Sequence, residues 1–152
     1  MDVQLSTSGE VVERARGSRR GLRSALVDLE DAVSAAGDVD IWAVRVGQAL
    51  HKVRHTLDYH VEATEAEDGL LADAVRQEPR LAHRADVLRR EHTELYLAVD
   101  DSLGRLPRLR TRAEMTAAQE QLLALMAAFS RHRHRGAELV YDAYATDISV
   151  GD

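Results

Sequence analysis

The chain has no cysteine, so disulfide bonds, iron–sulfur clusters and thiol chemistry are all excluded. Proline occurs only twice among 152 residues, and aromatic residues make up 4%. Windows rich in β-branched and aromatic residues, which are typical of strands, are also lacking. Alanine, leucine, valine, glutamate and arginine dominate instead, and this composition favours helices. These features together predict an all-α protein.

Basic surface, long apolar runs and targeting signals are also scarce. The formal net charge is −6 at pH 7, which argues against a general nucleic-acid-binding protein. No apolar run approaches the roughly 20 residues of a membrane-spanning helix. The first ten residues are polar and acidic, without the apolar core of a signal peptide. We therefore expect a cytoplasmic protein that binds neither membrane nor nucleic acid.

Apolar residues recur at the spacing of an amphipathic helix in four segments of the chain. Thr7 with Glu10, and Thr111 with Glu114, have capping-box spacing and predict the starts of the first and last helices. Short loops that contain glycine or proline separate the segments. The predicted helices cover about residues 10–36, 41–64, 79–103 and 112–144.

The chain is less regular between the second and third helices. Residues 70–75 either continue the second helix or form a separate turn, and residues 145–152 are predicted to fray or to lie along the surface. Short connections between long amphipathic helices imply antiparallel neighbours. We therefore expect an up-down-up-down antiparallel four-helix bundle, with residues 1–152 as one domain and its core at about 10–147.

Three of the seven histidines lie on or beside the apolar stripes of separate predicted helices. His60 falls on the second helix, His92 on the third and His132 on the last. A buried imidazole without a partner is costly, and imidazoles that converge in a bundle usually serve a metal, a haem or a proton path. One such histidine is more often a hydrogen-bonded core residue, but three at similar depths favour a shared site. The histidines predicted on polar, solvent-facing positions are His51, His55 and His83.

Carboxylates at metal-binding spacing are few. Residues four apart share a helix face, so a His-x-x-x-Glu pair can offer two ligands to one metal. Only His134 and Glu138 have this spacing, and one match is weak evidence in a chain rich in glutamate. Glu65 follows His60 by five positions and is within reach if the helix loosens near Gly69. The Glu-x-x-His pattern that ferritin-like di-iron proteins need twice is absent.

The order and spacing of these segments resemble the hemerythrin-like (HHE cation-binding) family over about residues 19–144. The resemblance implies a four-helix bundle with a non-haem di-iron centre that handles dioxygen, peroxide, nitric oxide or iron itself. The segments that carry it are His60-Val-Glu-Ala-Thr-Glu65 with Gly69-Leu70-Leu71, then Leu88-Arg-Arg-Glu91-His92, and finally His132-Arg-His134-Arg-Gly-Ala-Glu138-Leu-Val-Tyr141.

The resemblance also implies a set of iron ligands. Helical periodicity slightly favours His132 as the ligand from the last helix, whereas the family pattern favours His134, and both remain open. The metal site residues expected on this basis are His60, Glu65, His92, His132, His134 and Glu138. The ligand bound to the iron would be a small diatomic molecule or peroxide.

Three positions depart from the family pattern. Arg19 stands where the family has a histidine on the first helix, Thr64 replaces a carboxylate, and Gly136 follows His132 at a carboxylate position. An inward-facing Arg19 would repel a metal or pair with a glutamate. The alternative is therefore a degenerate member of the family without di-iron. Its core pocket would hold zinc, haem or an organic ligand, or the bundle would act as a sensing or interaction module.

Motifs for other chemistry are absent. The chain has no glycine-rich phosphate loop, no nucleophile elbow and no paired acid–base motif. The sequence leaves open whether the protein is an enzyme, and a protein partner or a homo-oligomer is compatible with it.

Overall fold

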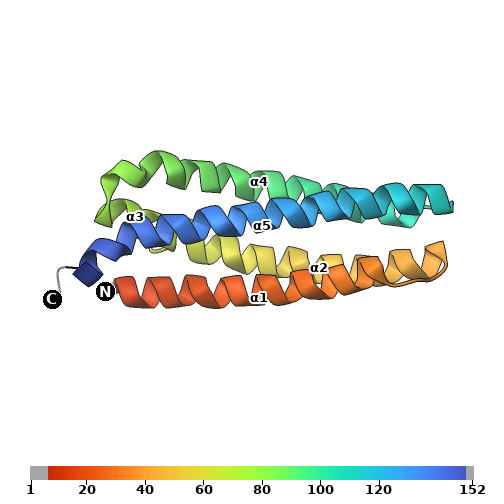
Figure 1. The fold of residues 1–152 in the computed structure, drawn as a ribbon, viewed down its shortest axis with the longest axis horizontal. Coiled ribbons are helices and arrows are strands. Elements are labelled where there is room, and N and C mark those ends of the chain that lie inside the picture. The colour runs from red at the N-terminus through yellow and green to blue at the C-terminus, as the bar shows by residue number, and fades with distance from the viewer. Residues whose placement is uncertain (1–6, 150–152) are drawn as a thin grey trace.

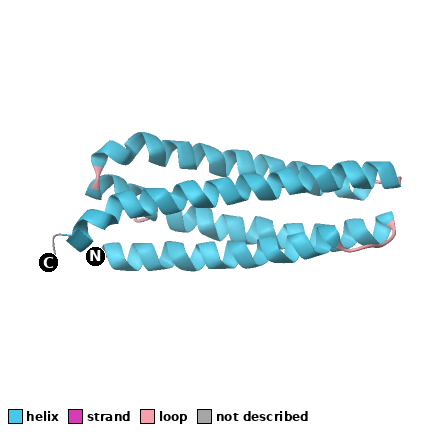
Figure 2. Cartoon of the chain, in the orientation of Figure 1, coloured by secondary structure: helices cyan, strands magenta, loops and turns pink. Residues whose placement is uncertain are grey.

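The computed structural model describes residues 7–149 of the chain. Within that range every element is helical and no strand is present, which confirms the all-α prediction (Figure 2). The long helices are α1 (Ser8–Ser34), α2 (Val39–Glu65), α4 (Ala82–Arg105) and α5 (Arg112–Ser149), and α3 (Leu70–Gln77) is short. Two single 3₁₀ turns, Pro79–Leu81 and Leu106–Arg108, flank α4.

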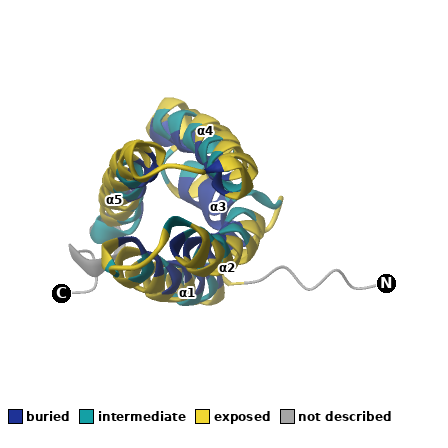
Figure 3. Ribbon diagram, turned by 90° about the vertical axis from the view of Figure 1, so that its right-hand side faces the viewer, coloured by how far each residue is buried: buried dark blue, intermediate teal, exposed yellow. Residues whose placement is uncertain are grey.

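The four long helices lie alongside one another as a helical bundle (Figure 1). The chain runs along the long axis in α1, returns in α2, and repeats this path in α4 and α5 (Figure 1). α1 packs mainly on α2, and α4 packs mainly on α5. Buried residues face the interior of this arrangement when it is viewed from the end (Figure 3). No helix in residues 7–149 is long and apolar enough to cross a membrane.

Both predicted helix starts are capped by threonine. Thr7 Oγ1 accepts a hydrogen bond from the Glu10 amide at 3.2 Å, and the Glu10 carboxylate accepts one from the Thr7 amide at 3.3 Å. This confirms the capping box at α1. At α5, Thr111 Oγ1 accepts from the Glu114 amide at 3.1 Å, while the Thr111 hydroxyl donates to the Glu114 carboxylate at 3.0 Å.

The structure corrects two details of the predicted helices. Pro79 begins a 3₁₀ turn, and the α-helix that follows begins only at Ala82. The last helix continues to Ser149, so its predicted end near residue 144 was too early, and of the two predictions for residues 145–152 fraying is wrong for 145–149. The Tyr144 hydroxyl donates to the buried Asp73 of α3 at 2.6 Å, and this bond holds the end of α5 against the bundle. Residues 150–152 lie outside the described range.

A layer of buried polar residues divides the apolar core. The larger apolar cluster includes Leu22, Leu57, Leu95 and Phe129, and lies on one side of the layer. Smaller clusters around Leu71, Leu139 and Leu70 lie on the other side, near α3. On α1, α4 and α5 the polar position falls between residues of the larger and smaller clusters, and on α2 it follows the larger cluster and precedes α3. The residues of this layer are Ser18, His60, Thr64, His92 and His132.

Candidate metal centre

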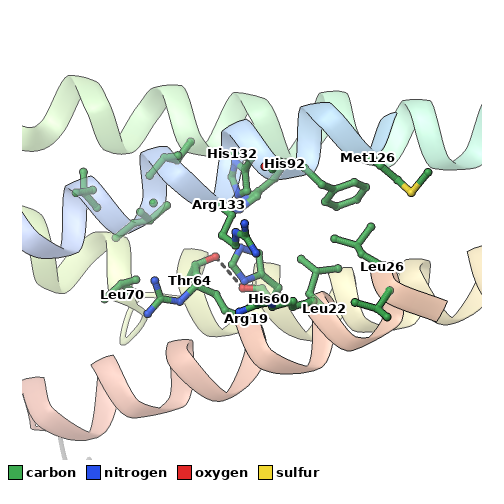
Figure 4. A pocket seen from close by; sticks show the side chains of 18 of the residues that line it. Arg19, Leu22, Leu26, His60, Thr64, Leu70, His92, Met126, His132 and Arg133 are labelled. Carbon is green, nitrogen blue, oxygen red and sulfur yellow. Dashed lines mark hydrogen bonds between the residues drawn. The ribbon is translucent and has the colours of Figure 1, made fainter. Parts of the chain in front are cut away.

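Three imidazoles converge in the polar layer (Figure 4). His60 comes from α2, His92 from α4 and His132 from α5, and all three are buried. One ring nitrogen of each lies within 4.8 Å of a ring nitrogen of both others. The ring centroids are 4.7 to 5.7 Å apart. Each histidine continues an apolar stripe by one helical turn, for example after Leu57 or Phe129, so the helix geometry turns it inward.

The hydroxyl of Ser18 determines which ring nitrogen of His60 carries the proton. Ser18 Oγ lies 3.2 Å from His60 Nδ1 and donates its own proton to the Ala15 carbonyl at 2.7 Å. A hydroxyl has only one proton to donate, so in this contact Ser18 accepts and His60 Nδ1 donates. In a neutral ring the other nitrogen, Nε2, then carries a free lone pair.

A carboxylate performs the same role for His132. Nδ1 of His132 lies 3.0 Å from Glu91 Oε1, and the other oxygen of Glu91 accepts a hydrogen bond from Arg135 at 2.6 Å. A carboxylate at neutral pH only accepts hydrogen bonds, so Nδ1 carries the proton here too. Arg135 balances the charge of Glu91 and holds it in place.

His92 has a looser partner. Its Nδ1 lies 3.2 Å from Glu65 Oε2, but the direction of the ring N–H does not suit a hydrogen bond, and this buried nitrogen has no hydrogen-bonding partner among residues 7–149. Burial raises the pKa of Glu65, and the nearby Arg89 opposes that change. Glu65 is therefore close to the centre, on the side of His92.

The three rings are electrically neutral at physiological pH. Burial, with the neighbouring His132 and Arg19 as smaller causes, lowers the pKa of His60 to about 3. Burial and the two other imidazoles lower the pKa of His92 to about 2. Burial also lowers the pKa of His132, although Glu91 opposes it. A neutral imidazole keeps a lone pair on one ring nitrogen, so each of the three rings can offer one donor to a cation.

The donors present fit a single transition-metal ion. Metal–imidazole bonds of about 2.0–2.1 Å place two donors on a tetrahedral ion about 3.3 Å apart. The ring nitrogens, which are within 4.8 Å, would close by up to about 1.5 Å around such an ion. Ligand histidines usually donate their second nitrogen to a carboxylate or another oxygen. Ser18 and Glu91 supply that oxygen for two of the three rings.

The structure keeps two of the expected ligands away from this centre. His134 and Glu138 form a pair at 3.0 Å, with side-chain exposures of 76% and 56%, on the outer face of α5. Helical periodicity favoured His132, and His132 is the residue that faces inward. The family pattern favoured His134, which is exposed. The remaining histidines His51, His55 and His83 are exposed, as predicted.

The three departures from the family pattern lie at the site. The Thr64 hydroxyl donates to the His60 carbonyl at 2.8 Å, which satisfies it within its own helix. Gly136 lines a cavity beside the histidines, and a methyl group there would meet no atom within 4 Å. Arg19 lines the same cavity. It makes no ion pair with Glu65 or Glu138, so the glutamate partner considered from the sequence is not observed.

Sequence reasoning missed two residues that orient the rings. Ser18 and His60 are 42 positions apart, and Glu91 and His132 are 41 apart, so no local spacing connects either pair. The one available signal for Ser18 is its place on the apolar stripe between Ala15 and Leu22, where a polar residue needs a partner.

No family model matches the chain, and no curated protein or solved structure matches it either.

Proposed function

We propose that the protein is a hemerythrin-like, up-down-up-down four-helix bundle that holds one metal ion on His60, His92 and His132. The observation that carries this proposal is the convergence of three buried, neutral imidazoles from three helices. Two of them have Nδ1 engaged by Ser18 or Glu91, which leaves the lone pair of Nε2 free for a metal.

A single ion suits the donors better than the di-iron centre that the resemblance implies. A second ion needs further ligands, and His134 with Glu138 is exposed on the outer face of α5. Glu91 is already engaged by Nδ1 of His132 and by Arg135. Arg19 adds a positive charge at the cavity wall, and this disfavours a second cation nearby.

Three neutral imidazoles with an open position are a donor set for iron(II) or zinc. The bound ion would supply Lewis-acid or redox chemistry to a small molecule such as dioxygen, peroxide or nitric oxide. The role of the chain is to orient the imidazoles through Ser18 and Glu91, and to restrict water with Leu88 and Phe129. Haem is not proposed, since the cavity of about 290 Å³ is at the lower limit of small-ligand pockets.

Metal content measured on a matched pair of variants tests the proposal. The protein and its His132→Ala and His134→Ala variants are reconstituted without oxygen, separately with iron(II) and zinc, then desalted and analysed for metal. We expect about one ion per chain in the parent and in His134→Ala, and far less than one in His132→Ala. Less than about a tenth of an ion in the parent with both metals, or equal losses in the two variants, would contradict the proposal.

A further inference from the structure

The cavity beside the three histidines is mostly apolar. It has a volume of about 290 Å³ and lies between α1, α2, α4 and α5. Leu22 and Leu26 of α1 and Met126 of α5 form much of its wall (Figure 4). Phe129 of α5 also lines it. The size and lining are those of a site for a small organic molecule with an aliphatic part.

Three arginines and one glutamate line the cavity, and Arg19 is the one of these four that is half-buried, whereas Arg23, Glu30 and Arg133 are exposed. Arg19 is half-buried, and burial lowers the pKa of its guanidinium, with Arg16 as a second cause. Among residues 7–149, Arg19 makes neither an ion pair within 4.0 Å nor a side-chain hydrogen bond, whereas Arg14, Arg54, Arg84 and others are paired. A partly desolvated guanidinium with five N–H groups is stabilised when an anion reaches it. The cavity therefore contains the recognition element for an anion.

The opening of the cavity is rich in arginine. A hollow between α1 and α5 shares Arg19, Arg23 and Arg133 with the cavity, and Arg19 and Arg133 lie on opposite sides of the pocket (Figure 4). This positive surface belongs to a chain of formal net charge −6, so it stands out against an acidic background. Such a local field attracts anions and raises their rate of entry. The arginines that line the hollow are Arg16, Arg19, Arg20, Arg23, Arg131, Arg133 and Arg135.

We propose that this cavity binds a small aliphatic carboxylate. The carboxylate meets the Arg19 guanidinium, and the hydrocarbon part lies against Leu22, Leu26 and Phe129. One inward cation matches one negative charge, and the apolar wall favours a tail over a polyanion such as phosphate. This carboxylate would be the ligand that lies beside the proposed metal centre, and in that respect the inference rests on the proposed function. Binding itself needs no metal, because Arg19 and the apolar wall hold the ligand without an ion.

Methyl NMR of the metal-free protein tests binding at the cavity. The chain has methionines at 115 and 126 besides Met1. Met126 lines the cavity, whereas Met115 is buried in the larger apolar cluster, about 16 Å earlier along α5. With ¹³C-methyl methionine, titration with octanoate should shift the Met126 signal and leave Met115 unchanged. Acetate and inorganic phosphate at the same concentration should shift neither, and octan-1-ol should bind at least about 10-fold more weakly.

Arginine variants show whether the charge of Arg19 recognises the ligand. Arg19→Gln should weaken octanoate binding by about 10-fold to 100-fold, the loss expected for a charge-assisted hydrogen bond. Arg19→Lys should recover part of it. Arg45→Gln, an exposed arginine of α2 outside the cavity, should have no effect. Because each titration uses chelator-treated protein, loss of the metal proposal would leave this result intact.

Two outcomes would overturn the inference. Octanoate and octan-1-ol that bind equally well would show an apolar cavity without anion recognition. Absence of a Met126 shift at millimolar octanoate, in metal-free and zinc-loaded protein alike, would show that the cavity does not take this ligand. A phosphate-induced shift of the cavity signals that exceeds that of octanoate would assign the arginines to phosphate and would also contradict it.

Discussion

Glu91 Oε1 lies 3.0 Å from Nδ1 of His132, on the opposite helix of the α4–α5 pair. In the proposed metal centre the acid would therefore act through the imidazole, by fixing its orientation and its proton, and not as a donor to the ion. Its second oxygen accepts from Arg135 at 2.6 Å, which holds the carboxylate in place.

Glu91→Gln should weaken metal binding without abolishing it. The glutamine amide oxygen can still accept a hydrogen bond from Nδ1 of His132. The imidazole then lacks a neighbouring negative charge, which would otherwise make it a stronger metal ligand. We expect zinc affinity to fall by about 10-fold to 100-fold in competition with a chromophoric chelator. Glu94→Gln, an exposed change one turn along α4, is the control and should leave affinity unchanged. Equal affinities for the two variants would contradict a positioning role for Glu91.

Ser18→Ala should destabilise the metal-free protein. The change removes the acceptor of the His60 Nδ1 proton inside the core, and an unsatisfied buried donor costs about 1–3 kcal/mol. Urea unfolding with chelator present measures the loss. Ser24→Ala, on an exposed position of the same helix, should differ from the parent by less than about 0.5 kcal/mol. A Ser18→Ala protein as stable as Ser24→Ala would show that His60 needs no partner.

The metal-free protein should lose stability as the pH falls below about 6.5. The folded-state pKa values of His60 and His92 are lowered to about 3 and about 2, so only the unfolded chain takes up protons on these residues between those values and about 6.5. Their contribution is complete above pH 6.5 and decreases toward acid. At about pH 5.5 each histidine should lower the free energy of unfolding by about 1.4 kcal/mol relative to neutral pH, or by about 3 kcal/mol for the pair.

Urea unfolding at several pH values between about 7.5 and 5.5 checks this dependence above the range where most carboxylates titrate. His92→Gln should flatten the dependence, and His51→Gln, which changes an exposed histidine, should not. If the unfolding free energy of the parent protein were the same at every pH in this range, His60 and His92 could not both be buried as neutral rings.

Two glycine variants should have opposite effects on thermal stability. A methyl group on Gly136 meets no atom within 4 Å, so Gly136→Ala should stabilise α5 by about 1 kcal/mol through helix propensity. A methyl group on Gly69 would lie 2.8 Å from the Thr64 carbonyl oxygen, so Gly69→Ala should destabilise the protein by about 1–3 kcal/mol. Melting curves in chelator decide both, and a stabilising Gly69→Ala would contradict the close approach of α2 and α3.

The helices and the inward histidines follow from local patterns, and for that reason the sequence predicts them. Periodicity of 3.6 residues places His60, His92 and His132 on apolar stripes, and threonine with glutamate three residues later marks two helix starts. The partners of the rings do not follow in this way. Glu91 meets His132 only because α4 packs against α5, and no rule of sequence spacing predicts contacts between side chains about 40 positions apart.

The end of α5 shows the same limit. Tyr144 is held by Asp73 of α3, a contact between helices that only the packed structure reveals, and the predicted helix stopped too early without it. For Arg19 the sequence does predict the direction of the side chain, since the residue lies on the apolar stripe of α1 and should face inward. The sequence could not show that it lines a cavity in which it forms no ion pair, although Glu30 lines the same cavity.

The polar layer makes the two ends of the bundle unequal. Beyond it, α3 and the adjoining turns rest on the small clusters around Leu71 and Leu70, while the opposite end has the larger one. One ion joining α2, α4 and α5 at that boundary would suppress local opening chiefly on the weaker side. Amide hydrogen exchange should then slow most in α3 upon loading, so that occupancy of the centre is reported by a helix that contributes no ligand to it.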